Sequence, residues 1–188
     1  MLPPILARKK ELGYPVFDGQ YDLNIVGVRK RNGAPNKFDD MLTCTYRQGG
    51  QWIAHYWTAT TDPGQYYLLN PLQIKGTAIL CPGHYSGVWE IGLHAGKYEA
   101  LCQRGAEVTV WRDADRDNQV DINGPKDTGF FGINCHKAGE SSSRVDRWSA
   151  GCQVLANESD FDEMMRLARM QIATLGYESF SYTLLEEW

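Results

Sequence analysis

A histidine and a cysteine sixteen positions apart are the residues of this sequence best suited to chemistry. His136 lies in the segment GINCHKAG at positions 132–139, and Cys152 ends the run SAGC at positions 149–152. A thiol is a strong nucleophile only as the thiolate, and a neighbouring imidazole can take its proton. These residue types predict covalent acyl chemistry, with Cys152 as the nucleophile and His136 as its base.

Gly151 stands directly before this cysteine. A glycine there leaves room where a substrate backbone would approach, and it lets nearby N–H groups turn toward an oxyanion. The loop from Glu140 to Trp148, which joins the histidine to the cysteine, contains three serines and charges of both signs. We expect this loop to be exposed and to form the rim of a cleft.

Structural roles are the alternative for these residues. Cys152 and His136 can be a small buried residue and a core histidine with no part in catalysis. On a strand, Cys135 would point to the opposite face from His136, so we expect it in the core. His84, His94 and His136 could form a zinc triad, but their spacing matches no zinc motif.

The five cysteines are an odd number, so at least one thiol cannot pair within the chain. None belongs to a C-x-x-C pair, which argues against a zinc ribbon or a thioredoxin-like site. Cys44, Cys81 and Cys102 have apolar neighbours in the sequence. We expect these three to be small buried residues.

A separate group of candidate ligands lies in the segment DADRDNQVD at positions 113–121. Its carboxylates alternate along the chain as at the start of an EF-hand calcium loop. This pattern predicts a structural calcium site formed by Asp113, Asp115, Asp117 and Asp121. Position twelve of such a loop carries a bidentate Glu, and here it is Gly124. An exposed acidic loop without a metal is therefore the alternative.

The motif around Cys152 resembles that of a known family. A histidine, a variable loop and then Ser/Thr-x-Gly-Cys resembles the signature of the L,D-transpeptidase (YkuD-type) catalytic domain family, and here His136 is followed by SAGC in that arrangement. The segment WSAGCQV at positions 148–154 looks like a divergent branch found in phage-encoded relatives. The likeness is looser over the region before His136.

The resemblance implies a mostly β fold, no cofactor, and an enzyme that acts on peptidoglycan stem peptides. In the family the cysteine attacks a carbonyl of a tetrapeptide stem, the terminal D-alanine leaves, and the acyl group passes to an amine or to water. Carried over to this chain, Cys152 is the nucleophile and His136 the general base. Ser149 and Gly151 shape the nucleophile loop, and backbone N–H groups near Cys152 form the oxyanion hole.

The family usually has an aliphatic residue and then Arg or Asn after the cysteine, whereas this chain has Gln153 and Val154. Arg144 and Arg147 are candidates to supply the positive charge that binds a stem-peptide carboxylate. An L,D-carboxypeptidase, or a lytic L,D-endopeptidase delivered by a phage or a secretion machine, fits the motif as well as a transpeptidase does. The third alternative is an inactive wall-binding or structural module.

The elements that must position these residues are mostly β-strands. Runs rich in β-branched and aromatic residues between turn signals predict strands over 23–28, 41–47, 52–61, 77–80, 88–93, 108–112, 130–136 and 180–185. Gly49 and Gly50 fit a hairpin turn. Apolar residues at helical spacing predict one α-helix over about 159–175, with Ser159 as its N-cap and Gly176 after its end. We expect a YkuD-like β-sandwich or barrel with this helix in its C-terminal half.

The length fits one domain over residues 21–188 after an N-terminal extension over residues 1–20. The net charge of −4 argues against a nucleic-acid partner, and no apolar run approaches the length of a membrane span. The first ten residues lack a basic segment followed by an apolar stretch, so we expect no secretory signal. Synthesis in the cytoplasm and delivery to the cell wall are the corresponding expectations.

Overall fold

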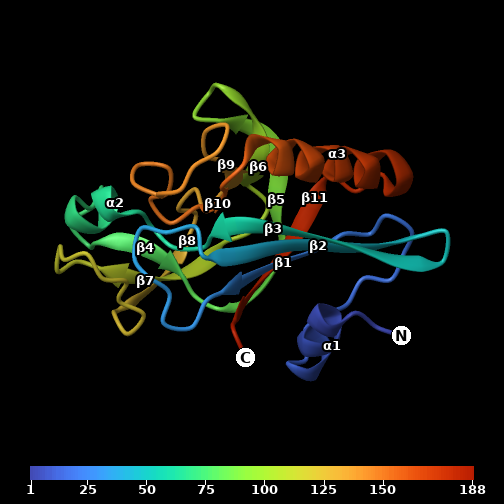
Figure 1. The fold of residues 1–188 in the computed structure, drawn as a ribbon, viewed down its shortest axis with the longest axis horizontal. Helices are drawn as coiled ribbons and strands as arrows, with labels where there is room; N and C mark the ends of the chain where they lie inside the picture. The colour runs from blue at the N-terminus through green and yellow to red at the C-terminus, as the bar shows by residue number, and fades with distance from the viewer.

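The computed structural model describes all 188 residues and consists mostly of β-strands (Figure 1). The three helices are α1 (Pro4–Glu11), α2 (Gln65–Leu69) and α3 (Glu158–Leu175). The strands are β1 (Asn24–Arg29), β2 (Asp40–Gln48), β3 (Gln51–Thr60), β4 (Thr77–Leu80), β5 (Gly83–His94), β6 (Tyr98–Gln103), β7 (Val108–Asp113), β8 (Lys126–Gly129), β9 (Cys135–Lys137), β10 (Gln153–Leu155) and β11 (Ser179–Glu186). The predicted fold class, mostly β with one long helix in the C-terminal half, is confirmed.

Eight strands close into a barrel in the order β1-β11-β5-β6-β9-β10-β3-β2. The pairs β1–β11 and β9–β10 are parallel, and the other neighbours are antiparallel. The β2–β3 hairpin turns at Gly49 and Gly50 as predicted, with φ angles of 57° and 80° that glycine adopts without strain. His136 lies on β9 and Cys152 directly precedes β10, so this parallel pair brings the two segments of the His–Cys motif next to each other.

A second, antiparallel sheet of three strands, β4-β7-β8, lies beside the barrel (Figure 1). Ala78 and Leu80 of β4, together with Val108 and Val110 of β7, belong to the same hydrophobic cluster as the barrel interior. Because the small sheet and the barrel share this core, β4 and β7 are held in a fixed position against the barrel wall. They form one side of the pocket described below.

Helix α3 packs its apolar stripe against the barrel, to which it contributes Phe161, Met164, Met165, Leu167 and Ala168. It ends at Gly176, whose φ of 70° is the left-handed conformation predicted for the residue after the helix. The predicted N-cap, Ser159, is wrong by two residues. Asn157 has the extended backbone of an N-cap residue, and Ser159 already lies inside the helix.

The segment predicted as an N-terminal extension contains α1, which the sequence pattern does not predict. Ile5 and Leu6 are buried in a small cluster with Val26 and Val28 of β1. Lys9 is almost fully buried and donates a hydrogen bond to the Asn24 side chain. The first residues are thus packed against the barrel, and no helix of the protein is long and apolar enough to cross a membrane.

The strand predicted over 130–136 is wrong over most of its length, because only Cys135–Lys137 forms β9. Gly132 has a φ of 71°, and the N–H groups of Phe131 and Ile133 both donate to the side chain of Gln103. A single side-chain amide therefore replaces the partner strand here. The short strands β6, β8 and β10 also have no counterpart among the predicted ones.

Candidate active site

His136 lies on β9, and Cys152 directly precedes the neighbouring strand β10. In the parallel register Cys135 is opposite Gln153, and His136 is opposite Val154. Cys135 is fully buried in the barrel core, as predicted, so the neighbouring His136 points to the other face. Cys152 lies two residues before Val154, directly before the start of β10.

The ring of His136 has one nitrogen committed to the backbone. Its Nδ1 lies 2.8 Å from the carbonyl oxygen of Lys137 and 3.5 Å from the hydroxyl of Tyr98. A carbonyl oxygen only accepts hydrogen bonds, so Nδ1 carries the proton of the neutral ring. This tautomer leaves Nε2 as the basic nitrogen.

Burial keeps this imidazole uncharged. His136 is 3% exposed, and the pKa of its ring is lowered to about 4 by burial and, to a smaller extent, by His94. The hydrogen bond to Lys137 opposes the shift. At neutral pH the ring is therefore the neutral form, which is the form that can accept a proton.

His94 is stacked on His136 and is held by Asn134. The two ring centroids are 4.1 Å apart, and His94 Nδ1 lies 3.1 Å from the side-chain nitrogen of Asn134. The oxygen of the same amide accepts the backbone N–H of Gln103 at 2.8 Å, which fixes the orientation of the amide. His94 Nδ1 is therefore an acceptor, and this ring too is neutral, with a pKa lowered mainly by burial.

The loop before Cys152 is shaped by Ser149 and Gly151. Ser149 is fully buried, its hydroxyl accepts the N–H of Gly151 at 3.1 Å, and it donates to the carbonyl of Cys152 at 2.8 Å. Gly151 has a φ of 121°, and a Cβ there would come within 2.4 Å of the Ala78 carbonyl oxygen. No loop or turn hydrogen bond within the backbone uses the N–H of Cys152.

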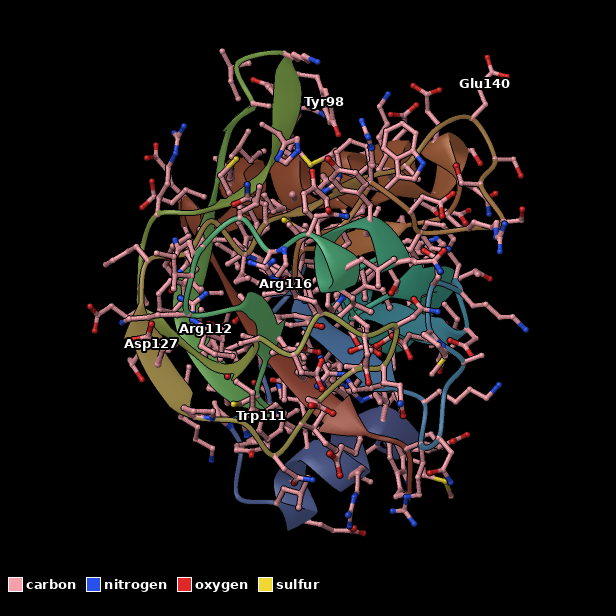
Figure 2. All side chains as sticks on the ribbon, turned by 90° about the vertical axis from the view of Figure 1, so that its left-hand side faces the viewer. Tyr98, Trp111, Arg112, Arg116, Asp127 and Glu140 are labelled. Carbon is pink, nitrogen blue, oxygen red and sulfur yellow. The ribbon has the colours of Figure 1, made fainter.

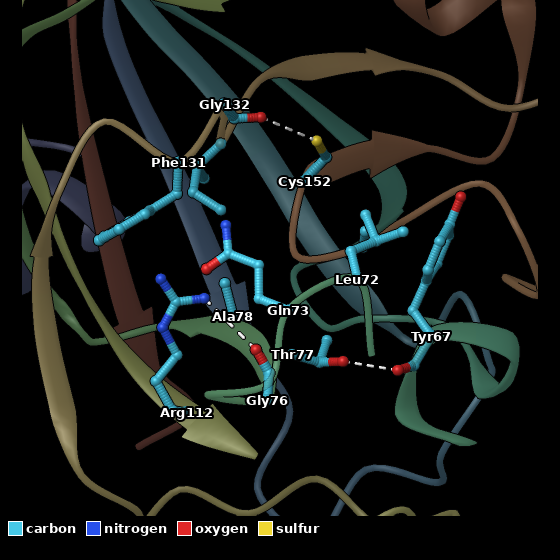
Figure 3. A pocket seen from close by; sticks show the side chains of 12 residues that line it. Tyr67, Leu72, Gln73, Gly76, Thr77, Ala78, Arg112, Phe131, Gly132 and Cys152 are labelled. Carbon is cyan, nitrogen blue, oxygen red and sulfur yellow. Dashed lines mark hydrogen bonds between the residues drawn. The ribbon is translucent and has the colours of Figure 1, made fainter. Parts of the chain in front are cut away.

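The sulfur of Cys152 is a protonated thiol in the free protein. Burial raises the pKa of the thiol to about 11, although a hydrogen bond from the Asn134 backbone partly opposes this shift. The Sγ–H donates to the carbonyl oxygen of Gly132 at 3.3 Å (Figure 3). The pair is thus a neutral thiol and a neutral imidazole, not a thiolate with an imidazolium.

A pocket of about 210 Å³ opens at this sulfur (Figure 3). Thr77 and Ala78 of β4 and Arg112 of β7 form one side, and the 131–133 turn with Ala150 and Cys152 forms the other. Arg112 is the one charged side chain that lines the pocket. Its guanidinium carbon lies 4.4 Å from the ring centroid of Phe131 (Figure 3). Its Nε and Nη2 donate to Asp127, which is labelled near it in Figure 2, and its Nη1 donates to the carbonyl oxygen of Gly76. His136 does not line this pocket.

Two buried glutamines hold the walls in place. Gln103 accepts the N–H groups of Phe131 and Ile133 and donates to the carbonyls of Ala106 and Gly129. Gln153 donates to the carbonyl of Gly151 at 3.3 Å, and its side-chain oxygen accepts the hydroxyl of Tyr182 at 2.7 Å. Gln153, one of the departures from the family pattern, therefore supports the loop that carries Cys152.

Ser149 and Gly151 shape the backbone next to Cys152, and His136 lies on the strand beside it without a hydrogen bond to its thiol, whereas Arg144 and Arg147 lie outside the pocket. Arg147 is exposed and stacks on the ring of Tyr66. His84 binds Thr183 and is stacked near Tyr14, so the three histidines considered for zinc do not form one group.

Sequence reasoning missed four residues of this site: His94, Tyr98, Gln103 and Arg112. Their positions follow from the pairing of β5, β6 and β7 with their neighbours, which no local pattern encodes. Asn134 had a detectable signal, because a polar side chain stands two positions before His136 on the same face of the chain.

The acidic loop contains part of the predicted ligand set. One oxygen each of Asp113, Asp115 and Asp121 lie within 4.8 Å of one another, whereas Asp117 is not in this group. The pKa of Asp113 is raised to about 6, mainly by burial and further by the neighbouring carboxylates.

Comparisons with models of protein families, with curated proteins and with solved structures found no match for this chain.

Proposed function

We propose that this protein is a cysteine acyltransferase or peptidase of the L,D-transpeptidase type, in which Cys152 attacks a peptidoglycan stem peptide and His136 is the general base. The observation that carries the proposal is the state of His136: a neutral ring, with its Nδ1–H bound to the Lys137 carbonyl, on the strand beside the segment whose thiol opens to a pocket.

The charge states favour general-base catalysis over a preformed ion pair. As the substrate carbonyl approaches, the thiol of Cys152 turns from the Gly132 carbonyl toward His136, and its proton passes to Nε2 while the C–S bond forms. The developing oxyanion is stabilised by the N–H of Cys152. A low-dielectric surrounding strengthens this hydrogen bond.

The tetrahedral species then breaks its C–N bond. The leaving amine, which is the terminal D-amino acid in the family, takes the proton from the imidazolium and departs, and a thioester remains on Cys152. An acceptor amine or a water molecule next gives its proton to His136, attacks the thioester and releases the thiol. The two activities differ only in the acceptor: an amine makes the enzyme a transpeptidase, and water makes it a hydrolase.

The pocket supports a short peptide as the substrate. Its volume of about 210 Å³ accommodates a few side-chain groups rather than a folded protein segment. Arg112 is the one charged side chain of the lining; Asp127 pairs its charge through Nε and Nη2, and a carboxylate of the stem peptide would compete with Asp127 for this guanidinium. We therefore propose Arg112, rather than Arg144 or Arg147, as the residue that binds the substrate carboxylate.

A YkuD-like fold is part of the same proposal. It rests on the His–Cys motif and on adjacent parallel strands that bring its two parts together within a β-barrel. Gln153 and Val154 depart from the family pattern, and the contacts of Gln153 with Gly151 and Tyr182 offer an alternative support for the loop.

A mass-spectrometric assay tests the proposal. The reduced protein is incubated with purified stem peptides or cross-linked muropeptides, and the products are identified by mass. Loss of terminal D-alanine identifies a carboxypeptidase, exchange or new cross-links a transpeptidase, and cleavage of existing cross-links an endopeptidase. Cys152→Ala should abolish conversion, whereas Cys81→Ala, which removes a different thiol, should retain it. A correctly folded wild-type protein that converts none of these substrates would leave only the binding-module alternative.

A further inference from the structure

The loop between β7 and β8 contains a group of carboxylates that the proposed acyl chemistry does not use. One oxygen each of Asp113, Asp115 and Asp121 lie within 4.8 Å of one another. Oxygens bound to the same calcium ion lie about 2.4 Å from it, so two of them are at most about 5 Å apart. The three side chains are therefore spaced as ligands of one ion.

Asp113 gives an independent reason to expect an ion. Its side chain is 1% exposed, and its Oδ2 accepts the N–H of Asp121 at 3.2 Å. Its Oδ1 is buried and has no hydrogen-bond partner. An unpaired buried carboxylate oxygen is costly, and the protein supplies nothing to satisfy it.

The charge of the group is also unbalanced. None of the ion pairs of the protein includes Asp113, Asp115 or Asp121. The neighbouring Asp127 shows the contrast, since Arg112 and Lys75 both bind it. A group of three uncompensated carboxylates, one of them buried, calls for a cation from solution.

Asn118, in the same loop, has a second unsatisfied side-chain oxygen. Its side-chain oxygen is likewise buried without a hydrogen-bond partner. Asp117 is different, because both of its carboxylate oxygens accept hydrogen bonds from Gln119. The ligand set therefore differs from the regular EF-hand spacing.

We infer that the β7–β8 loop binds one divalent cation of the calcium type through Asp113, Asp115 and Asp121, with Asn118 as a further oxygen ligand. Only oxygen ligands are present, which suits a hard cation and excludes the nitrogen and sulfur environment of zinc. Calcium accepts irregular geometry with many oxygens, whereas magnesium demands a near-ideal octahedron.

The ion would stabilise one wall of the pocket. Asp113 follows Arg112, and its carbonyl lies so close to Gly76 that a Cβ there would come within 2.2 Å of it. Both Arg112 and Gly76 line the pocket at Cys152. Fixing Asp113 therefore fixes the strand end that carries the charged side chain of the pocket.

Isothermal titration calorimetry of the full chain tests the inference. The protein is first freed of metal with a chelator and is then titrated with calcium chloride and, in a separate experiment, with magnesium chloride. We expect one saturable calcium site, weaker magnesium binding, and a higher melting temperature with calcium. Asp115→Asn and Asp121→Asn are suitable variants because both residues are exposed, and each should weaken calcium binding about tenfold or more.

Asp117→Asn is the matched control, since it removes the same charge from the same loop outside the group, and it should bind calcium almost as wild type does. Absence of saturable binding at millimolar calcium would overturn the inference. Equal weakening by Asp117→Asn and Asp115→Asn would overturn it as well, because that result indicates diffuse attraction. Binding is measured directly, so failure of the acyl chemistry would leave this result unaffected.

Discussion

The imidazole of His94 is stacked on the imidazole of His136, with centroids 4.1 Å apart and an angle of 22° between the ring planes. Burial is the main cause that lowers the pKa of both rings. The nearby His94 adds to the shift of His136, whose pKa is lowered to about 4, and Lys97 adds to that of His94. Burial and the stacked ring thus keep the proposed base neutral over most of the pH range.

The pH profile of turnover should reflect this shift. His136 acts in its neutral form, so activity should persist as pH falls from 7 to 5 and decline only near pH 4, not near the usual histidine value of 6.5. His94→Phe retains a stacked ring but removes the charge, so the acid limb should move to higher pH. Turnover rates of both proteins on a stem peptide, measured from pH 3.5 to 8, test this prediction. A wild-type activity that already declines near pH 6.5 would contradict it.

Alkylation of Cys152 should be slow at neutral pH. A pKa of about 11 in place of 9.0 leaves about one hundredth of the usual thiolate, and the labelling rate should rise about tenfold per pH unit between 7 and 10. Peptide mapping after iodoacetamide treatment reports the rate at this site. The other four cysteines are buried and provide internal controls. A rate that is already maximal at pH 7 would indicate a preformed thiolate.

Gly151→Ala should abolish activity. The substitution forces a side chain into a φ of 121° and within 2.4 Å of the Ala78 carbonyl, so the loop carrying Cys152 must shift. Gly139→Ala is the control, because a Cβ there has its nearest contact at an ordinary 3.4 Å. Turnover and circular dichroism of both variants test this, and an active, folded Gly151→Ala protein would show that the loop geometry is unimportant.

Tyr182→Phe should lower the free energy of unfolding by about 1–3 kcal/mol, since it leaves the buried side-chain oxygen of Gln153 without its donor. Tyr56→Phe, at an exposed tyrosine, should change it little. Urea unfolding at pH 7 gives both values. An equal effect of the two substitutions would mean that the Gln153 contact adds no stability.

Several parts of the fold were predictable because they depend on local physics. The apolar stripe of α3, the Gly49–Gly50 turn and strand β4 follow from periodicity and from glycine conformation. The strand predicted over 130–136 was wrong because residues 131–133 form a turn there. This turn is held by the side chain of Gln103, a residue about 30 positions away. Helix α1 lacks a wide apolar stripe, and its burial depends on β1 and β11.

The same limit applies to the site. Cys152, His136, Ser149 and Gly151 lie in one short stretch, so a motif could identify them. His94, Tyr98 and Arg112 join them only through strand pairing across the barrel and the small sheet, which depends on long-range packing. The charge states of Cys152 and His136 are likewise a result of burial, which the motif does not encode.

Detection of the acyl-enzyme tests the central claim most directly. The reduced protein is mixed with a tetrapeptide stem, quenched in acid and analysed by intact-mass spectrometry, with peptide mapping of any adduct. The account predicts an adduct with the mass of the peptide acyl group on Cys152, slower formation in His136→Gln, and none in Cys152→Ala. An adduct on another residue, or turnover by Cys152→Ala, would contradict it.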